Sequence, residues 1–327
     1  MLIDNHKRTI NYLRLAVTDR CNLRCNYCMP AEGISFVQNK KLLTIDELKK
    51  ISQVLVGQGV SKIRITGGEP FVRKDLIDLL RYLQKLEGLD DISITTNATL
   101  IGPYIDELKK LGIKNINVSL DAIDRSTFEK ITRRNQYDTV HENLIRLITE
   151  GFNVRINFIV LEGQNEQDII PILELMKNYP VSVRFLEEMP FNGGSKSFEK
   201  ITWDYKVILT HITKHFSNFK KLDSPETSTS INYKIEGHKG TFGLIPSFSR
   251  TFCGSCNRLR ITATGDIITC LYGKPKANLR DIVRNKNSKN GIENAILKVV
   301  GSRAKTGFDA QKEHGGVFEN SMTSIGG

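Results

Sequence analysis

Short apolar runs rich in β-branched residues alternate with longer amphipathic segments through the first 190 residues. A short run followed by a segment with helical spacing is typical of strand–helix units around a parallel sheet. We therefore predict an α/β fold with a parallel sheet. The six runs that read as strands are residues 12–17, 62–66, 91–95, 115–120, 154–160 and 181–187.

One helix start is marked clearly. Thr44 with Glu47 three residues later has the spacing of a capping box, in which each side chain accepts a hydrogen bond from the other residue's backbone N–H. Leu48, Ile51 and Leu55 follow at helical spacing. The pattern predicts a helix that begins after Thr44.

Six strand–helix units are fewer than the eight of a closed barrel. We expect an incomplete (β/α)6 TIM-like barrel with an open side, and a doubly wound sheet is the alternative. Residues 192–200 and 221–230 are rich in Gly, Ser, Thr and Pro, which predicts linkers or surface loops. We divide the chain into a partial barrel, residues 1–220, and a C-terminal region, residues 221–327, that covers the open side.

Composition excludes several classes of protein. With 39% hydrophobic and 25% charged residues among 327, the chain is typical of a folded globular protein. Its apolar stretches fall short of the ~18 residues that a membrane span requires. The polar opening MLIDNHKRTI does not resemble a signal peptide. We expect a cytoplasmic protein with no membrane partner.

The net charge of +11 is concentrated toward the C-terminus. Residues 221–327 hold 16 Lys and Arg against 9 Asp and Glu. Such an excess suits a polyanion, either nucleic acid or a nucleoside triphosphate. A solvated basic surface is the alternative.

The six cysteines form two triplets. They are too few for a disulfide scaffold, so in a reducing compartment their spacing suggests metal ligands. The first triplet is Cys21, Cys25 and Cys28, and the second is Cys253, Cys256 and Cys270.

The first triplet has the spacing C-x3-C-x2-C on one loop. Three such cysteines can bind three irons of a 4Fe–4S cluster and leave the fourth iron open to a substrate. A structural zinc site is the alternative, but it normally needs four protein ligands, and His6 lies before the first strand. Polar residues between the cysteines disfavour buried thiols without a metal.

Polar residues also follow other predicted strands, where a parallel fold gathers its reactive groups. Gly68 and Glu69 follow the second strand, Ser119 and Asp121 the fourth, and Glu187 the sixth. These positions predict a polar rim at one end of the sheet.

With these motifs the chain resembles the radical S-adenosylmethionine superfamily. The resemblance rests on C-x3-C-x2-C after the first strand, on Tyr27 before the last cysteine and on GGEP after the second strand. It implies that the open iron binds S-adenosylmethionine, with contacts from Tyr27, Gly68, Ser119 and Met189.

A narrower resemblance covers essentially the whole chain. YLRLAVTDRCN, KIRITGGEP, NVSLDA, FCGSCNRLRIT, CLYG, NLRDIV and the terminal Ile325-Gly326-Gly327 are similar, in order, to the GTP 3′,8-cyclase family of molybdenum-cofactor biosynthesis. This implies a lyase that converts GTP to (8S)-3′,8-cyclo-7,8-dihydroguanosine 5′-triphosphate by radical chemistry at the cofactor. No side chain is assigned as a general acid or base.

The family resemblance also implies two 4Fe–4S clusters, one at each triplet, with the second facing the guanine. Arg and Lys are suited to a triphosphate, and several of the matching positions are cations inside apolar strands, where each needs an anion. Pairing with Asp19, Glu69 or Glu187 is the alternative. The positions that match the family's GTP contacts are Arg14, Lys62, Arg64, Thr95, Arg155, Arg184, Arg258 and Arg260.

Two positions depart from the family pattern, and the tail belongs to it. Ala98 stands where Gly is frequent, and Arg155 stands where Lys is common. Gly326 and Gly327 have no side chains, so they can thread into a narrow cavity and meet an arginine. We expect the tail to enter the barrel mouth.

The implied partners are GTP, an electron donor protein and the next enzyme of the molybdopterin pathway, without nucleic acid, and a homodimer is left open. A radical maturase acting on a peptide is a second interpretation, although it usually has more cysteines in the auxiliary region. A third is a non-enzymatic iron–sulfur protein that binds RNA through its basic C-terminal third.

Overall fold

The computed structural model describes residues 1–194, 200–285, 290–315, 318 and 320–326. Within them, twelve strands form one sheet in the order β12-β11-β10-β1-β2-β3-β4-β5-β6-β9-β8-β7. The strands are β1 Tyr12–Ala16, β2 Lys62–Thr66, β3 Asp91–Thr96, β4 Asn115–Ser119, β5 Asn153–Ile159, β6 Ser182–Leu186, β7 Phe219–Lys221, β8 Ile231–Ile235, β9 Thr241–Ile245, β10 Arg258–Ile261, β11 Asp266–Ile268 and β12 Ala277–Asn278.

The predicted α/β fold with a parallel sheet is confirmed. Strands β1 to β6 are the six predicted strands, each within one residue at either end, and they pair in parallel in chain order. The C-terminal region adds a parallel strand at each side, β10 beside β1 and β9 beside β6. Antiparallel strands extend both edges beyond these.

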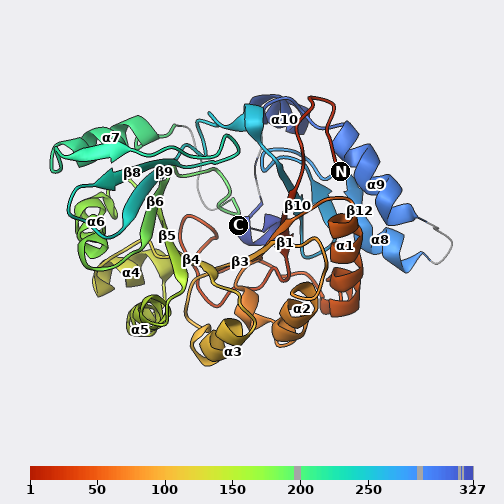
Figure 1. The fold of residues 1–327 in the computed structure, drawn as a ribbon, viewed down its shortest axis with the longest axis horizontal. Coiled ribbons are helices and arrows are strands. Elements are labelled where there is room, and N and C mark those ends of the chain that lie inside the picture. Colours follow the sequence, from red (N-terminus) through yellow and green to blue (C-terminus); the bar gives the residue numbers. More distant parts are fainter. Residues whose placement is uncertain (195–199, 286–289, 316–317, 319, 327) are drawn as a thin grey trace.

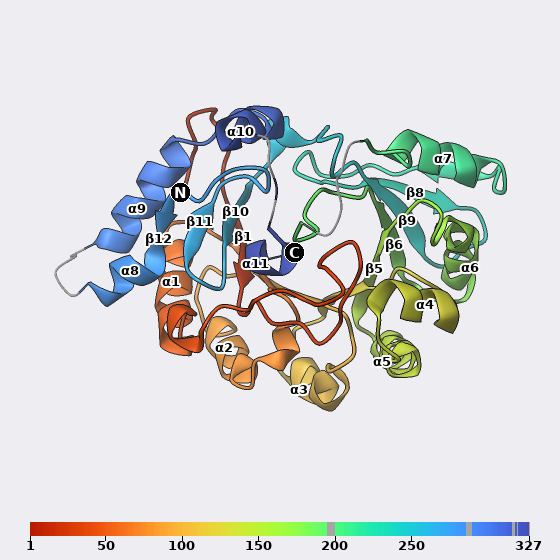
Figure 2. The same cartoon turned by 180° about the vertical axis from the view of Figure 1, so that it is seen from behind.

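Helices α1 to α6 lie along the outer side of the curved sheet, and the C-terminal end of the described chain lies on its inner side (Figure 1). The view from behind gives the same arrangement (Figure 2). The helices are α1 Ile45–Gly57, α2 Leu76–Leu83, α3 Ile105–Lys110, α4 Arg125–Thr132, α5 Tyr137–Thr149, α6 Ile169–Asn178, α7 Tyr205–Thr213, α8 Leu279–Arg284, α9 Gly291–Gly301, α10 Gly307–His314 and α11 Met322–Ile325.

Helix α1 begins where its capping box predicts. The Thr44 hydroxyl accepts a hydrogen bond from the Glu47 backbone N–H, and the Glu47 carboxylate accepts one from the Thr44 N–H. The apolar face of Leu48, Ile51 and Leu55 is fully buried against the sheet and neighbouring helices. Local sequence and tertiary packing therefore agree in this helix.

The period-2 pattern of the strands separates the two faces of the sheet. In β2, Ile63 and Ile65 are buried in the main apolar core, while Lys62 and Arg64 alternate with them and face the concave side. Parallel pairing then brings cations into register, with Arg14 of β1 opposite Arg64 of β2. The alternation that buries the apolar residues therefore also places positive charges on the concave face of the sheet.

The two predicted loop segments have different outcomes. Residues 222–230 form the connection between β7 and β8, as expected for a loop. Residues 195–199 of the other segment lie outside the described residues.

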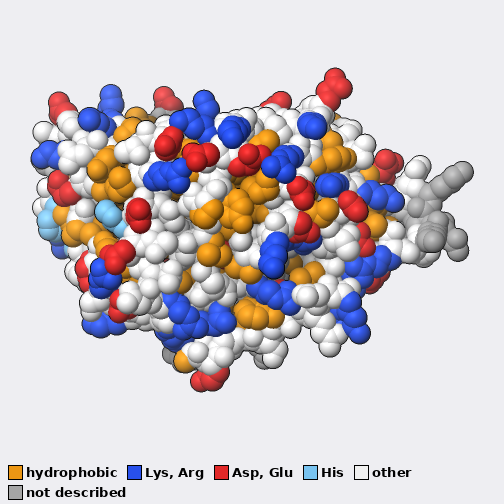
Figure 3. All heavy atoms as spheres, turned by 90° about the horizontal axis from the view of Figure 1, so that it is seen from below, with side chains coloured by type: hydrophobic (Ala, Val, Ile, Leu, Met, Phe, Trp, Pro, Cys, Tyr) orange, Lys and Arg blue, Asp and Glu red, His pale blue; other side chains and the backbone are white. Residues whose placement is uncertain are grey.

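On the face of the molecule seen from below, basic and acidic side chains are interspersed with apolar ones (Figure 3). In the described part of the chain, the helices are too short or too polar to cross a bilayer.

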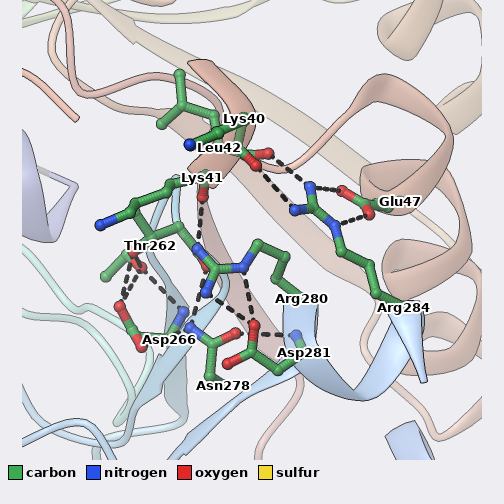
Figure 4. Close-up of polar contacts among 11 residues, drawn as sticks. Lys40, Lys41, Leu42, Glu47, Thr262, Asp266, Asn278, Arg280, Asp281 and Arg284 are labelled. Carbon is green, nitrogen blue, oxygen red and sulfur yellow. Dashed lines mark hydrogen bonds and ion pairs between the residues drawn. The ribbon is translucent and has the colours of Figure 1, made fainter. Parts of the chain in front are cut away.

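Helix α8 fastens the C-terminal region to the start of α1 (Figure 4). Arg284 binds the Glu47 carboxylate through Nε at 2.6 Å and Nη2 at 3.1 Å, and it also donates to the carbonyls of Lys40 and Leu42. Burial alone would raise the pKa of Glu47, but the bonds from Arg284 and Thr44 outweigh it and lower the pKa. Glu47 is therefore ionised in the folded protein at neutral pH.

Replacing Arg284 with Met should lower the free energy of unfolding by about 1 kcal/mol at pH 7, since Arg284 is partly exposed and solvent weakens the pair. The folded-state pKa of Glu47 lies below its unfolded value of 4.5, so the contribution is present above that pH and is lost as the pH falls through the folded pKa. Urea denaturation at pH 7 and at acid pH measures it. Arg81→Met, which removes a more exposed pair with Glu107, is the control and should cost less.

Candidate active site

A cavity of about 600 Å³ lies on the concave side of the sheet. Strands from both ends of the sheet and the loops that follow them contribute to its wall. The sequence-predicted site residues that line it are Arg14, Cys21, Cys25, Tyr27, Cys28, Lys62, Arg64, Gly68, Thr95, Ser119, Arg155, Arg184, Met189, Cys253, Cys256, Arg258, Arg260 and Cys270. The fold therefore gathers in one place groups that lie as much as 256 positions apart, from Arg14 to Cys270.

The loop that carries the first triplet is held against the GGEP turn. The Gly68 N–H donates to the Thr18 carbonyl at 2.9 Å, and the Glu69 N–H donates to the Arg20 carbonyl at 2.8 Å. A Cβ on Gly68 would lie 2.2 Å from the Arg20 carbonyl oxygen. Gly68 is thus required by the packing of the two loops, a reason that the sequence did not reveal.

Burial dominates the chemistry of the first three thiols. It raises the pKa of Cys21 to about 12, and it also raises the pKa values of Cys25 and Cys28. The Cys21 sulfur accepts a hydrogen bond from Asn97 Nδ2 at 3.7 Å, and the Cys28 sulfur lies 3.4 Å from the Ser321 hydroxyl. Without a metal these thiols are neutral, whereas a bound metal deprotonates them.

The second triplet lies in a more basic environment. Cys256 accepts hydrogen bonds from Arg303 at 2.9 Å and from Arg258 at 3.7 Å. Burial raises the pKa of Cys256, but the two arginines more than offset this and lower it. The Cys253 sulfur accepts the Gly307 N–H at 3.3 Å, while burial raises the pKa values of Cys253 and Cys270.

The residues at both triplets fit an iron–sulfur cluster. All six cysteines are free thiols and line the same cavity, and N–H groups already point at sulfur in both triplets, as in cluster sites. In the described ranges, no three His, Cys, Asp or Glu side chains converge closely enough to hold a single metal ion. A cluster does not need that convergence, because each cysteine binds a different iron.

The arginines in the cavity are not paired with the carboxylates that the sequence offered as alternatives. Asp19 pairs with Arg20 and accepts the Val37 N–H, while Glu69 accepts bonds from Phe71, Thr96 and Asn97. The third candidate, Glu187, accepts bonds from Tyr205, Phe248 and Ser249. Among the described residues, Lys62 alone of the predicted GTP contacts has an ion pair, with Asp91.

Burial and mutual repulsion therefore disfavour the charged form of two of these arginines. Burial first, and then neighbouring arginines, lower the pKa of Arg14 to about 10 and that of Arg184 to about 9. The Nε atoms of both are buried without a partner among the described residues. A cavity with several such cations is suited to a multiply charged anion.

Tyr12 was not predicted as a site residue, although it lies among these cations. Lys62, Arg64 and Arg258 approach its ring to between 5.4 and 5.6 Å. Burial raises the pKa of Tyr12, but the surrounding cations outweigh it and lower the pKa to about 8. The alternation of β1 was the available signal, since it puts Tyr12 on the same face as Arg14.

Asp121 was predicted only as a polar residue at the rim of the sheet, with no role assigned, and Arg250 was missed. Asp121 accepts a hydrogen bond from the Tyr27 hydroxyl at 2.7 Å, which fixes that ring, and burial raises the pKa of Asp121 to about 6. The guanidinium of Arg250 lies 3.8 Å from the Tyr272 ring centre and 4.1 Å from that of Phe308. The place of Asp121 after the fourth strand indicated that it lies at the rim, whereas the sequence gives no signal for Arg250.

The tail reaches the inner side of the sheet. Arg260 donates a hydrogen bond to the Gly326 carbonyl. Gly326 has φ +76°, and a Cβ there would lie 2.8 Å from the Ala16 side chain, so the position needs glycine. Gly327 lies outside the described residues.

The two departures from the family pattern have local structural settings. Ala98 has φ +61°, in the left-handed region that suits glycine, and its carbonyl accepts a hydrogen bond from Asn143. Arg155 donates to the Asn115 side chain at 3.2 Å. Both positions are thus compatible with the fold, and the left-handed conformation at Ala98 carries a backbone cost.

Two family models match the chain, Radical SAM superfamily over residues 15–176 and Molybdenum Cofactor Synthesis C over residues 181–308. The GTP 3′,8-cyclase of Clostridium botulinum is 37% identical over 288 residues, 88% of this chain and 89% of that protein. The mitochondrial GTP 3′,8-cyclase of Arabidopsis thaliana is 36% identical, covering 99% of this chain and 81% of its own. Molybdenum cofactor biosynthesis protein 1 of Homo sapiens is 38% identical over 98% of this chain.

This chain spans about half the length of the human relative, 49%, and of its bovine counterpart, 50%. Solved structures are more distant. Streptococcus suis SuiB matches with a TM-score of 0.62 at 18% identity, over 90% of this chain and 66% of that one. Native anSMEcpe with bound AdoMet matches with a TM-score of 0.57 at 13% identity, over 93% and 82%. These structures share the fold.

Inorganic triphosphate should raise the melting temperature of this protein, because an anion that binds the folded cavity stabilises the folded state. Arg184→Gln should be no less stable than the parent without ligand, since it removes a buried cation. Its gain with triphosphate should be smaller, because a lost charge-assisted contact costs ~1.5–3 kcal/mol. Differential scanning calorimetry at matched triphosphate concentrations measures both effects.

Arg284→Gln is the matched control, since this arginine binds Glu47 outside the cavity. It should respond to triphosphate like the parent. An equal gain in melting temperature in Arg184→Gln and the parent would contradict an anion site at Arg184.

Proposed function

Since this chain belongs to the GTP 3′,8-cyclase family of radical S-adenosylmethionine proteins, we propose that it catalyses the cyclisation of GTP in molybdenum-cofactor biosynthesis. The observation that carries the proposal is one cavity lined by both cysteine triplets and by several arginines, of which Arg14 and Arg184 each have an Nε without a partner among the described residues. Such a cavity offers separate sites for S-adenosylmethionine, a base and a triphosphate within one enclosure. Holding reactants together in this way lowers the entropic part of the barrier.

An incomplete (β/α)6 barrel is the fold that we propose for the N-terminal part. It is supported by the six consecutive parallel strands with helices along their outer side. In this description residues 1–220 form the partial barrel and residues 221–327 the C-terminal region. Strands β9 and β10 of that region continue the parallel sheet at each side, which supports its role as the cover of the open side.

Each triplet would hold one 4Fe–4S cluster. Bound at Cys21, Cys25 and Cys28, a cluster supplies the electron for reductive cleavage of S-adenosylmethionine. The protein's part is to position the ligand: Tyr27, fixed by its bond to Asp121, and the backbone at Gly68 border this site. Ser119 and Met189 complete the proposed set of S-adenosylmethionine contacts.

GTP would lie between the two triplets. Its triphosphate brings about four negative charges, which would offset the repulsion among the buried or partly buried arginines of β1, β2, β5, β6 and β10. The proposed contacts are Arg14, Lys62, Arg64, Thr95, Arg155, Arg184, Arg258 and Arg260. Cys253, Cys256 and Cys270 border the other end, where a ring nitrogen of guanine can meet the second site.

The arrangement favours a nucleotide over the two alternative substrates. A peptide substrate of a radical maturase needs a groove, whereas the cations here line a cavity with an arginine-rich wall. RNA needs an outer surface of one sign, and on the face in Figure 3 the two signs are interspersed. An electron donor protein, a following pathway enzyme, a cytoplasmic location and a homodimer stay predictions.

Mutations in the two triplets should have different effects on the two reaction products. Cys25→Ala should abolish formation of 5′-deoxyadenosine, because the site of reductive cleavage is lost. Cys256→Ala should retain some 5′-deoxyadenosine formation while losing cyclised GTP. Both products are measured by liquid chromatography on anaerobically reconstituted protein, together with iron and sulfide content.

About eight irons per chain in the parent and about four in each variant are the accompanying expectation, since each site holds one cubane. Unchanged 5′-deoxyadenosine formation by Cys25→Ala would refute the assignment of the first triplet. Stoichiometric zinc in place of iron would refute the proposed function.

The tail provides a second test. Removing Gly326 and Gly327 takes away the carbonyl that Arg260 binds, while the residues around both triplets are kept. We expect normal iron content and thermal stability but at least a tenfold lower rate of GTP cyclisation, since Arg260 loses its orientation. If truncated protein of matched iron content forms product at the full-length rate, the tail has no role in the reaction.

A further inference from the structure

The N-terminal loop, residues 2–10, packs on the second cysteine triplet. The loop closes on itself through a bridge between Ile3 and Thr9 and a bond from the Ile10 N–H to the Leu2 carbonyl. In both ribbon views it runs beside α9 and α10 (Figure 1). Neither the sequence motifs nor the proposed function uses this segment.

Asp4 is the centre of this loop. Its carboxylate is buried and accepts hydrogen bonds from the backbone of His6 and Arg8 and from Arg8 Nε at 2.6 Å. Arg8 in turn donates to the carbonyls of Cys253, Ala304 and Lys305. Asp4 thus organises a cation that ties the second triplet to the segment that follows α9.

Arg303 is the second cation held at Asp4. Its Nε lies 3.9 Å from the Asp4 carboxylate, and the His6 ring lies 3.0 Å from its backbone carbonyl. Its Nη2 donates to the Cys256 sulfur at 2.9 Å, and its Nη1 is buried without a partner among the described residues. A buried guanidinium therefore points at the proposed cluster ligand Cys256, and its Nη1 can still donate to another acceptor.

The first triplet has no such cation among its described sulfur contacts. Its sulfurs meet the neutral side chains of Asn97 and Ser321. The charged groups that act on Cys21 and Cys25 include the carboxylates of Glu69 and Asp121. The sulfurs of the two triplets thus differ in their contacts. Those of the first meet neutral side chains, with Arg24 reaching Cys21 only at its backbone carbonyl, whereas Cys256 of the second accepts hydrogen bonds from two arginines.

We propose that Arg303, held at Asp4, raises the reduction potential of a cluster at the second triplet above that of a cluster at the first. The inference rests on the proposed function in one respect, that the second triplet holds a 4Fe–4S cluster. A reduced cluster carries one more negative charge, so a nearby cation and N–H···S bonds stabilise it. Arg303 is a positioning residue in this role, since it acts through Cys256 and need not touch GTP.

The test is a redox titration followed by electron paramagnetic resonance, without GTP or S-adenosylmethionine. Serine replacements of Cys21, Cys25 and Cys28 leave the second cluster as the one observed in the full-length chain. In this background Arg303→Gln should shift the midpoint potential to a more negative value, and Arg303→Lys should shift it less because the charge is kept. Asp4→Asn should shift it to a more positive value, because a buried negative charge is removed.

Arg284→Gln, an arginine outside the network, is the control and should leave the potential unchanged. Loss of structure alone would move Arg303→Gln and Asp4→Asn in the same direction, so opposite shifts support the charge role. An unchanged potential in Arg303→Gln with full iron content, or a more negative one in Asp4→Asn, would overturn the inference. If Arg303→Gln fails to hold iron, Arg303→Lys and Asp4→Asn decide.

These outcomes are distinct from those of the proposed function. A chain whose potentials shift as expected but that forms no cyclised GTP would refute the function alone. A chain that forms cyclised GTP while Arg303→Gln leaves the potential unchanged would refute this inference alone.

Discussion

Repulsion among buried cations is the constraint on which the architecture of this site depends. Arg260, Arg14 and Arg64 occupy matched positions on the adjacent strands β10, β1 and β2, so parallel pairing holds them side by side. Burial lowers the pKa values of Arg14 and Arg260, and the carboxylates Glu69 and Glu187 nearby bind other groups. The folded chain tolerates this because the apolar face of the same strands is deeply buried, and the proposed anionic substrate would offset the repulsion.

The carboxylates of the rim serve the backbone rather than the arginines. Glu187 accepts bonds from three backbone N–H groups and one hydroxyl, and Glu69 joins the end of β3 to the GGEP turn. Glu69 and Glu187 are thereby satisfied by hydrogen bonds from uncharged groups, without a cation. The carboxylates therefore hold the loops in place, and the arginines of the cavity stay available for a ligand.

The C-terminal region is integrated with the N-terminal one at several points. It extends the sheet at both sides, and Arg284 binds it to α1. Its tail lies against the carboxyl ends of β1 and β2. The N-terminal loop makes the reverse connection, from Asp4 and Arg8 to the second triplet. Because the cavity is shared by both regions, its shape depends on each of these contacts.

The sequence by itself determined the six parallel strands, the start of α1, both cysteine triplets and the cations of the strands. These features follow from local periodicity and spacing, which a chain carries without its fold. Only the tertiary structure decided that both triplets share one cavity, that Arg14 and Arg64 have no carboxylate partner among the described residues, and that Arg303 reaches Cys256. Such contacts join residues tens to hundreds of positions apart, so they arise from packing and register, which local pattern does not encode.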